Sequence, residues 1–284
     1  MIAIVIPTRN RANNLDVVLR ALADQSASWD NYEVIVSDDH SNDGTYNVWD
    51  RYAAQPGTHF KYVNNNTKPH SWNASVPRNL GAFIADPQCT AFWFVDSDIV
   101  MPHHAVATYM EDLERKPDRV IIGSYDFYRK DNEVIAVPDV RNTKFESVGV
   151  DELFSTVHDG LACFGGNIVI PRHIFWDVKG FSVDTHIGLE DGDMGLKLWK
   201  RQTNFSYDNR VRGKHLWHET PPDRFPPDMK DHIDKLNMKH FGTKDPDYGI
   251  IEASRETYAS WGITGWNPPP EWVKMGFGME VNKV

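Results

Sequence analysis

The chain has 284 residues, of which 40% are hydrophobic and 25% are charged, so it can bury a sizeable core and has the composition of an ordinary globular protein. Its formal net charge is −10 and it contains no stripe of Lys or Arg. This excludes duplex nucleic acid as an expected partner, because phosphate neutralisation supplies most of that affinity. A phosphorylated ligand would need a metal ion or a few local arginines instead.

Cysteine content and hydropathy point to the cytoplasm. Cys89 and Cys163 are too few for a disulfide framework or a zinc site, so a reducing compartment is expected. The apolar run 2–6 has no basic leader and stops at Pro7, which indicates a buried strand rather than a signal peptide. No apolar run approaches the roughly 20 residues of a spanning helix. We therefore expect a cytoplasmic protein without a transmembrane segment, for which contact with a membrane surface stays open.

The first third of the chain alternates apolar strands with helices. Strands are predicted at residues 2–6, 32–39, 60–65 and 90–98, and helices at 15–25, 45–55 and 75–86. The polar loop 8–14 is expected to cap the first helix, and the Asn-Asp-Gly sequence at 42–44 to turn the chain. This alternation predicts βαβ units around a parallel sheet.

The rest of the chain is less regular. Pro102 suits the first turn of a helix at 103–116. The further predictions in chain order are strands at 119–128 and 133–138, a loop at 138–149, a short strand and helix within 164–181, a helix at 188–201, a strand and a proline-rich loop within 204–228, a helix at 228–242 and an irregular tail at 260–272. No repeat or clear linker interrupts the chain, which favours one domain with a C-terminal extension.

Polar side chains follow several predicted strand ends. These residues are Thr8, Asp38, Asp39, Asp96 and Asp98. Ligands of open parallel sheets bind beyond the carboxyl ends of the strands, and those ends meet at one edge. We therefore expect these side chains to converge.

The stretch FWFVDSDIV carries the sharpest chemical signal. Side chains two residues apart on a strand share a face, so Asp96 and Asp98 would form an oxygen-rich site suited to Mg²⁺ or Mn²⁺. The alternative is an ordinary turn with two solvated aspartates. The placement after a buried strand, among other strand-end acids, favours the metal site.

The remaining candidates each have a structural alternative. Asp38 and Asp39 could bind a nucleoside or hold the turn that follows them, and Arg78 could pair with a pyrophosphate or a carboxylate, or lie on the surface. The acids Glu190, Asp191 and Asp193 could supply a general base or complement a helix dipole. His215 and His218 could complete a metal shell with Asp98, or lie in a polar loop.

These residues occur in segments that resemble a known family. IVIPTRNRANNLDVVLRAL, VIVSDDHSNDGT, PRNLGAFIA and FVDSD resemble the nucleotide-sugar half of family 2 glycosyltransferases with the GT-A fold. GGNIVIPRHIFWDVKGF and GLEDGDMGLKL resemble the acceptor side of galactosyl- and N-acetylgalactosaminyltransferases. The resemblance implies an α/β, Rossmann-like GT-A domain at 1–220, divided into a nucleotide-binding half (1–100) and an acceptor-side half (101–220). Residues 221–284 would form a helical and irregular extension.

The resemblance also implies donor-side roles. Thr8 and Asp39, with Pro7, Arg9 and Asp38 beside them, would hold the uridine of a UDP-sugar. Arg78 would contact the nucleotide or its diphosphate.

The aspartate pair and a histidine would complete the donor side. Asp96, with Ser97, would lie at the ribose or sugar and at the metal. Asp98 would ligate the Mn²⁺ or Mg²⁺ that bridges the two phosphates. His218 resembles the family's metal-binding histidine, and His215 is the alternative.

On the acceptor side, Asp191 would deprotonate the acceptor hydroxyl and Glu190 would hold the acceptor or orient the base. The Q-x-x-R-W signature of processive members is absent, so the resemblance implies an inverting, metal-dependent, non-processive transfer of a hexose or N-acetylhexosamine. The resemblance of the acceptor-side segments favours galactose, N-acetylgalactosamine or a related hexose as the donor sugar. Two alternatives remain. A sugar nucleotidyltransferase would have a Gly-rich loop where this chain has PTRNRANN, and a non-catalytic sugar-binding protein would not need both acidic pairs.

Overall fold

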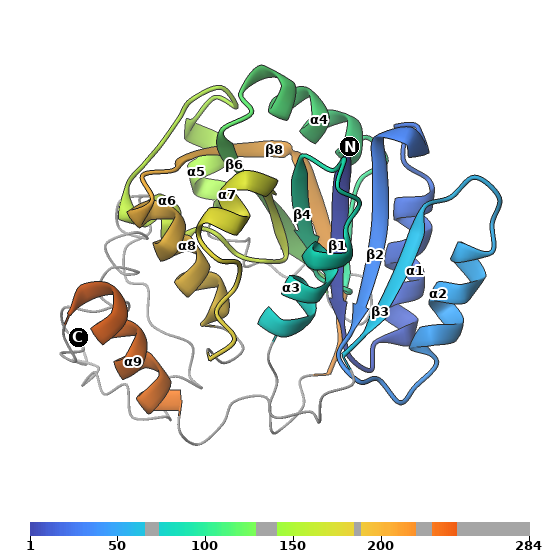
Figure 1. Cartoon of the computed structure of the whole chain (residues 1–284). Coiled ribbons are helices and arrows are strands. Elements are labelled where there is room, and N and C mark those ends of the chain that lie inside the picture. The colour runs from blue at the N-terminus through green and yellow to red at the C-terminus, as the bar shows by residue number, and fades with distance from the viewer. Residues whose placement is uncertain (66–73, 129–140, 185–188, 220–228, 243–284) are drawn as a thin grey trace.

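The computed structural model describes residues 1–65, 74–128, 141–184, 189–219 and 229–242, which form a mixed sheet with helices on both faces (Figure 1). The strands lie in the order β3-β2-β1-β4-β7-β6-β8-β5. Their bounds are Ile2–Thr8 (β1), Tyr32–Asp38 (β2), Phe60–Asn64 (β3), Ala91–Val95 (β4), Ile99–Val100 (β5), Arg119–Phe127 (β6), Asn167–Pro171 (β7) and Asn204–His215 (β8).

Helices α1, α2 and α4 pack on one face of the sheet, and α3, α7 and α8 pack on the other. The helices are Ala12–Ala23 (α1), Thr45–Ala53 (α2), Ser75–Ile84 (α3), Ala105–Arg115 (α4), Arg141–Ser147 (α5), Val157–Leu161 (α6), Arg172–Asp177 (α7), Glu190–Lys200 (α8) and Met229–Phe241 (α9), with a 3-10 turn at Trp29–Asn31. In the part of the chain that the structure describes, no helix combines the length and the apolarity needed to span a bilayer.

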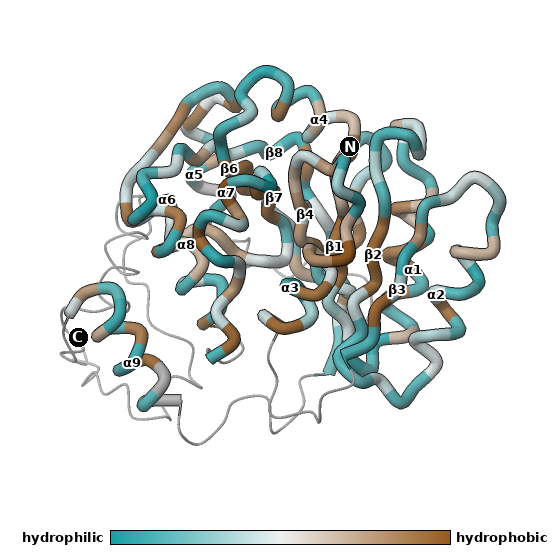
Figure 2. Tube along the Cα trace, in the orientation of Figure 1, coloured by the Kyte–Doolittle hydropathy of each residue, from teal (hydrophilic) through white to brown (hydrophobic). Residues whose placement is uncertain are grey.

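The central strands are buried on both faces, which explains their unbroken apolar sequences. In β1, the side chains of Ile2, Ile4 and Ile6 join the core beneath α1 and α4. Those of Ala3 and Val5 join the opposite core beneath α3 and α7. Figure 2 shows the resulting hydrophobic colour along β1 and β2. Successive side chains of a strand point to opposite faces, so a strand between two helical layers needs apolar residues throughout.

Strand direction brings the candidate residues to one edge, as expected. β1 pairs in parallel with both β2 and β4, so the carboxyl ends of these strands lie together. The expectation of a parallel sheet is incomplete, because β7 runs antiparallel between β4 and β6. β6 therefore runs in the same direction as β4. A sheet whose first half is parallel and whose second half contains a reversed strand agrees with the expected GT-A fold.

Two predicted helix starts are wrong. Pro102 precedes the helix, since α4 begins at Ala105, whose amide donates to the Pro102 carbonyl at 3.0 Å. The loop 8–14 does not cap α1, which begins inside it at Ala12 without a side-chain cap from the preceding residue. The Ala12 amide instead donates to Asp43 Oδ2 at 3.0 Å, so the turn after β2 supplies this acceptor.

The loop predicted at 138–149 contains a helix, α5. Phe145 packs against Tyr207 with ring centroids 5.4 Å apart. The Arg141 guanidinium lies 4.8 Å from the Tyr125 ring centre and 4.7 Å from that of Phe164. The strand predicted at 133–138, the proline-rich segment 220–228 and the tail 260–272 lie outside the described residues.

The helix predicted at 228–242 is confirmed as α9, and it packs on α8. Leu196 of α8 shares a cluster of buried side chains with Ile233 and Leu236 of α9. Gly242 follows the helix at a φ of 70°, where glycine carries no steric penalty. This part of the C-terminal extension therefore joins the core of the domain.

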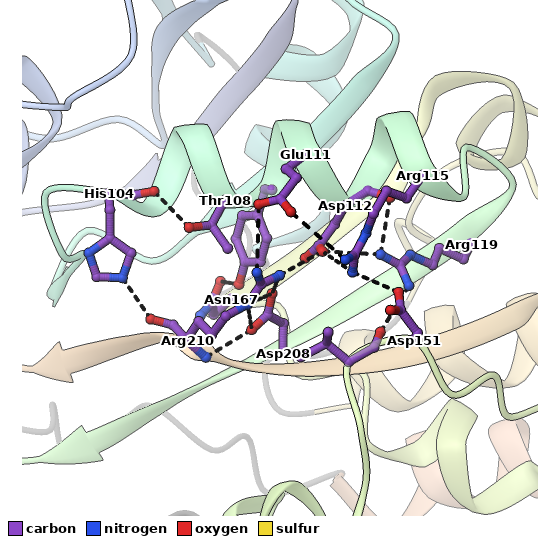
Figure 3. A network of polar contacts seen from close by, with 12 residues as sticks. His104, Thr108, Glu111, Asp112, Arg115, Arg119, Asp151, Asn167, Asp208 and Arg210 are labelled. Carbon is purple, nitrogen blue, oxygen red and sulfur yellow. Dashed lines mark hydrogen bonds and ion pairs between the residues drawn. The ribbon is translucent and has the colours of Figure 1, made fainter.

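A polar network fastens α4 to β6 and β8 (Figure 3). Arg210 Nη2 lies 2.7 Å from Asp112 Oδ1 and 2.7 Å from Asp208 Oδ2. Arg119 Nη2 lies 3.3 Å from Asp112 Oδ1, and Asp112, Asp208 and Arg119 are each 1% exposed. Because Arg119 begins β6, this end of the network lies at the sheet edge opposite the carboxyl ends of β1 and β4. We assign the network a structural role.

Candidate active site

The ends of β1 and β2 form the first part of the site. Asp39 donates its amide to the Thr8 carbonyl at 2.8 Å, and its Oδ1 accepts from Asn65 Nδ2 at 3.0 Å. Arg9 Nη1 lies 3.6 Å from Asp39 Oδ2. Burial raises the pKa of Asp39 above its usual value. Thr8 Oγ1 is buried and has no hydrogen-bond partner among the described residues, so polar groups at this edge remain available to a ligand. Pro7 lies beside them within β1.

Asp38 is occupied by structural contacts. Its Oδ1 accepts from the Ser41 amide at 2.9 Å and from Ser41 Oγ at 2.5 Å. Its Oδ2 accepts from the Tyr62 hydroxyl at 2.5 Å. Of the two roles open to Asp38, the structure provides the turn, and a nucleoside contact by Asp39 stays a prediction.

Asp96, Ser97 and Asp98 lie in a turn, because β4 already ends at Val95. The strand-alternation argument for a shared face is therefore wrong. Asp96 Oδ1 lies 2.9 Å from Arg78 Nη2, whereas Asp98 contacts two histidines. Ser97 is buried between them. The two carboxylates thus have different partners.

Among the described residues, one group of side chains could ligate a metal ion: Asp98, His215 and His218. A potential ligand atom from each lies within 4.8 Å of those of the other two. His218 Nε2 lies 3.1 Å from Asp98 Oδ2, and His215 Nε2 lies 3.6 Å from Asp98 Oδ1. Asp98 Oδ1 is buried without a hydrogen-bond partner among the described residues, as expected where a cation would bind. Both histidines meet Asp98, so the two alternatives from the sequence are not exclusive. Asp96 is not part of this group.

The polar contacts of Asp98 favour its charged form. Burial acts to raise the pKa of Asp98, but the hydrogen bond from His218 and the charge of His215 outweigh it and hold this pKa below its usual value. An ionised carboxylate with two imidazoles is a donor set that suits Mn²⁺ and other divalent ions of that type.

Arg78 joins the two halves of the site. Its Nη1 lies 3.1 Å from Glu190 Oε1 and 3.1 Å from Asp191 Oδ1, and its Nη2 binds Asp96. The side chain is 2% exposed and its guanidinium lies 5.2 Å from the Phe181 ring centre. A buried guanidinium with three carboxylate partners is placed to orient them. The surface position that the sequence left open as an alternative is therefore wrong, and Arg78 pairs with carboxylates. Its expected contact with a nucleotide or diphosphate stays a prediction.

The first turn of α8 places its three acids differently. Glu190 is 3% exposed, and burial together with the Asp191 charge raises the pKa of Glu190 to about 7. The Asp191 side chain is 21% exposed, so it can reach a substrate. Asp193 points away to α9, where its Oδ1 lies 2.7 Å from His240 Nε2 and 2.7 Å from Lys239 Nζ.

The sequence interpretation missed Gly165 and Arg11. A Cβ on Gly165 would lie 2.5 Å from Asp191 Oδ1 and 2.6 Å from Arg78 Cζ, so a larger residue would displace at least one of these side chains. The Gly-Gly pair in FGGNIVI belongs to a segment that resembles the acceptor side of the family, but no role was assigned to Gly165 itself. Arg11 Nη2 lies 3.1 Å from His218 Nδ1, a contact across the fold that no local pattern indicates.

Comparison with known proteins agrees with this geometry. Residues 3–178 match the model of glycosyl transferase family 2. Validoxylamine A glucosyltransferase from Streptomyces hygroscopicus subsp. jinggangensis is 25% identical over 92% of this chain and 68% of its own length.

Two solved structures share the fold. TarS from S. aureus in complex with UDP-GlcNAc has a TM-score of 0.68 at 16% identity, over 92% of this chain and 71% of that one. GalNAc-T7 with UDP, GalNAc and Mn²⁺ has a TM-score of 0.64 at 15% identity, over 92% of this chain and 55% of that one. The sheet with its reversed strand is thus a GT-A fold, and the chain belongs to glycosyl transferase family 2 and is a glycosyltransferase.

Proposed function

We propose that this chain transfers a hexose or an N-acetylhexosamine from a UDP-sugar to an acceptor hydroxyl, with inversion, metal dependence and one or few transfers per acceptor. The observation that carries the proposal is Arg78, which contacts Asp96 on the donor side and Asp191 on the acceptor side. A transferase needs these two sides beside one another. The acceptor would be a glycan, a lipid-linked glycan or a small molecule.

The nucleotide would lie over the ends of β1 and β2. Thr8 Oγ1 and the buried Asp39 carboxylate offer polar atoms at this edge, with Arg9 beside Asp39. Asp39 Oδ2 would accept the N–H of uracil, and Ser97 would lie towards the ribose. The structure of TarS with UDP-GlcNAc supports a UDP-sugar as the donor class.

Asp98, His215 and His218 would hold the divalent cation. When bound, a divalent ion would supply Lewis-acid stabilisation of the negative charge that develops on the departing diphosphate. The mixture of one carboxylate and two imidazoles favours Mn²⁺ over Mg²⁺, which prefers oxygen ligands. The Mn²⁺ in the GalNAc-T7 structure supports this choice.

Asp191 would act as the general base. Its partly exposed carboxylate would accept the proton of the acceptor hydroxyl while that oxygen attacks the anomeric carbon. Arg78 Nη1 donates to Asp191 Oδ1 and also to Oε1 of buried Glu190. These contacts would fix the orientation of the Asp191 carboxylate. A single displacement from the face opposite the diphosphate inverts the anomeric configuration.

Location and domain limits belong to the same proposal. Cys89 and Cys163 are both buried free thiols, which supports a cytoplasmic location. An acceptor at a membrane surface is compatible with that location. The transferase domain would span 1–220. The contacts of α9 with α8 make part of the 221–284 extension a support for that domain.

UDP release measured with Mn²⁺ and a panel of UDP-sugars tests the proposal. Asp191→Asn should lower kcat by at least about 10³-fold, because the hydroxyl loses its base. The matched control is Asp177→Asn, since Asp177 is 61% exposed and pairs with Arg201. Turnover by Asp191→Asn equal to that of the control would reject the base. An α-linked product from an α-linked donor, determined by NMR, would reject inversion.

A sugar nucleotidyltransferase would instead release pyrophosphate from a nucleoside triphosphate, and a sugar-binding protein would bind UDP-sugar without releasing UDP. The same assay separates these alternatives.

A further inference from the structure

We infer that the acceptor of this enzyme is a glycan, one of whose sugar rings stacks on Tyr125 and Phe127 of β6. These two side chains form an aromatic strip beside the proposed base. The inference rests on the proposed function, since it names the class of acceptor that the same site takes.

The aromatic strip lies next to one of the histidines of the candidate metal site. Phe127 of β6 is paired with His215 of β8, and their ring centres are 4.9 Å apart. The Tyr125 ring centre lies 5.6 Å from that of His215. The strip therefore borders the position at which the diphosphate of a donor would be held.

Tyr125 also reaches the acceptor side of the site. A Cβ on Gly166 would lie 3.0 Å from Tyr125 Cε1 and 3.2 Å from Asp96 Oδ2, so the ring and this carboxylate approach the same point. A Cβ on the preceding residue, Gly165, would lie 2.5 Å from Asp191 Oδ1. The strip thus begins near the proposed base, where an acceptor must present its hydroxyl. Since β6 runs in the same direction as β4, Phe127 continues the strip along the strand to the edge of the sheet that carries the site.

Neighbouring side chains fix the aromatic strip in place. The Tyr125 and Phe127 rings meet edge to face, with centres 5.4 Å apart. The fully buried guanidinium of Arg141 lies 4.8 Å from the Tyr125 ring centre and 4.7 Å from that of Phe164. Tyr125 also packs against the core beneath α1 and α4. Rings fixed in this way can bind a ligand with little further loss of conformational entropy.

The surroundings of the aromatic strip favour a sugar over a lipid chain. Both rings are half-buried, and Asp126 between them forms an ion pair with Arg212 of β8. A sugar ring has an apolar C–H face and a rim of hydroxyls, so it matches an aromatic face with polar neighbours. A lipid chain would need a contiguous exposed apolar patch. Within β6 and residues 204–219, Trp217 is the only large hydrophobic side chain that is strongly exposed.

Phe127→Ala removes the outer ring of the aromatic strip. It should weaken the binding of a glycan acceptor by about tenfold or more, because an aromatic stacking surface is lost. UDP affinity at saturating Mn²⁺ should stay within about twofold of the wild type, since the inference assigns no nucleotide contact to this ring. Phe127→Tyr keeps the ring and should bind the glycan like the wild type. Phe127→Leu keeps apolar volume without a flat face and should lose most of the glycan affinity.

Phe154→Ala is the matched control. Phe154 is also half-buried, meets Tyr207 with ring centres 5.5 Å apart, and has Lys144 Nζ 4.0 Å from its ring centre. It forms a bridge with Phe205 near the start of β8, at the sheet edge opposite the site. The control loses a comparable aromatic contact and should leave both affinities unchanged.

Binding can be measured with the full chain, without turnover. The labelled protein, with UDP and Mn²⁺, is applied to an array of immobilised neutral and acidic oligosaccharides. The oligosaccharide that binds best is then titrated by calorimetry, both as the free sugar and as its octyl glycoside. These two forms separate recognition of the sugar from recognition of an attached lipid.

Equal weakening of the two forms in Phe127→Ala and Phe127→Leu, absent in Phe154→Ala and Phe127→Tyr, supports the inference. Weakening of the octyl glycoside alone, unchanged glycan affinity in Phe127→Ala, or a wild type that binds no oligosaccharide of the array overturns it. If Phe127→Ala does not fold, the comparison of Phe127→Leu with Phe127→Tyr decides. Failure of the wild type to bind UDP with Mn²⁺ would reject the proposed function instead, while the array without nucleotide would still test the aromatic strip.

Discussion

Arg78 Nη1 lies 3.1 Å from Asp191 Oδ1, and this contact joins α3 to the first turn of α8. The same guanidinium binds Asp96 after β4 and Glu190 of α8, so one buried cation lies among three carboxylates from two parts of the fold. Buried charges of one sign are tolerated only with such a partner. Arg78 therefore makes the acidic cluster compatible with folding and sets the direction of the proposed base.

Arg78→Lys should lower kcat by about 10²-fold while changing the KM of the donor much less. A lysine keeps the charge but cannot present two nitrogens to three carboxylates, so the base loses its direction. Steady-state kinetics with the preferred UDP-sugar measure kcat and the KM of the donor separately. A rise in KM with unchanged kcat would assign Arg78 to nucleotide binding instead. Arg78→Ala should lower the free energy of unfolding by about 3 kcal/mol, because buried Glu190 and its two partly exposed neighbours lose their counter-ion.

Gly165→Ala should abolish most turnover while the protein stays folded. The added Cβ would meet Asp191 Oδ1 at 2.5 Å and Arg78 Cζ at 2.6 Å, so one of these side chains must move. Displacement by about 1 Å at a reacting group costs on the order of 10²-fold in rate. Gly44→Ala is the matched control, since its Cβ would meet only Ala12 Cβ at 3.8 Å. Equal kcat in the two variants would show that turnover does not depend on the close approach of Gly165 to the Asp191 and Arg78 side chains.

The first half of the fold could be predicted because its signals are local. The apolar runs of β1, β2 and β4 are long enough to identify buried strands, and the polar residues after them mark one edge of a parallel sheet. The position of Thr8 and Asp39 at this edge could be predicted in this way. The prediction that Asp96 and Asp98 share a face of the strand was wrong, because β4 already ends at Val95 and the exact end of a strand is poorly encoded in the sequence.

The second half depends on contacts between distant residues. Helix α5 has the sequence RNTKFES, in which Asn, Thr and Ser are weak helix formers, and it is held by the packing of Phe145 and the stacking of Arg141. The reversed direction of β7 has no signature in its own residues. The pairing of Arg11 with His218 spans 207 positions, so sequence spacing could not indicate it.

Glu190→Gln should change the pH dependence of stability. Burial and the Asp191 charge raise the pKa of Glu190 to about 7 in the folded protein, from an ordinary value of 4.5. Between these values the folded state holds a proton that the unfolded state has lost. The stabilisation from Glu190 is thus fully present below about pH 4.5 and is lost as the pH rises through about 7.

Glutamine cannot titrate, so the melting temperature of Glu190→Gln relative to the wild type should rise from pH 5.5 to pH 8. Thermal unfolding at constant ionic strength measures this difference, and Asp177→Asn provides the baseline. A difference that is constant with pH would mean that Glu190 stays ionised throughout this range.

His240→Ala should destabilise the protein and loosen the first turn of α8, which carries the proposed base. Asp193 is fully buried, and its Oδ1 accepts hydrogen bonds from His240 Nε2 and Lys239 Nζ, each at 2.7 Å. Loss of the buried His240 partner should cost about 1–3 kcal/mol, which at this chain length is a fall of several degrees in melting temperature. Lys239→Ala is the matched comparison, since the Lys239 side chain is 41% exposed and such ion pairs contribute about 0–1 kcal/mol. Because Asp193 lies one turn from Glu190, kcat should also fall in His240→Ala, while Mn²⁺ affinity should not change. Equal melting temperatures for the two variants would mean that α9 does not depend on this buried contact.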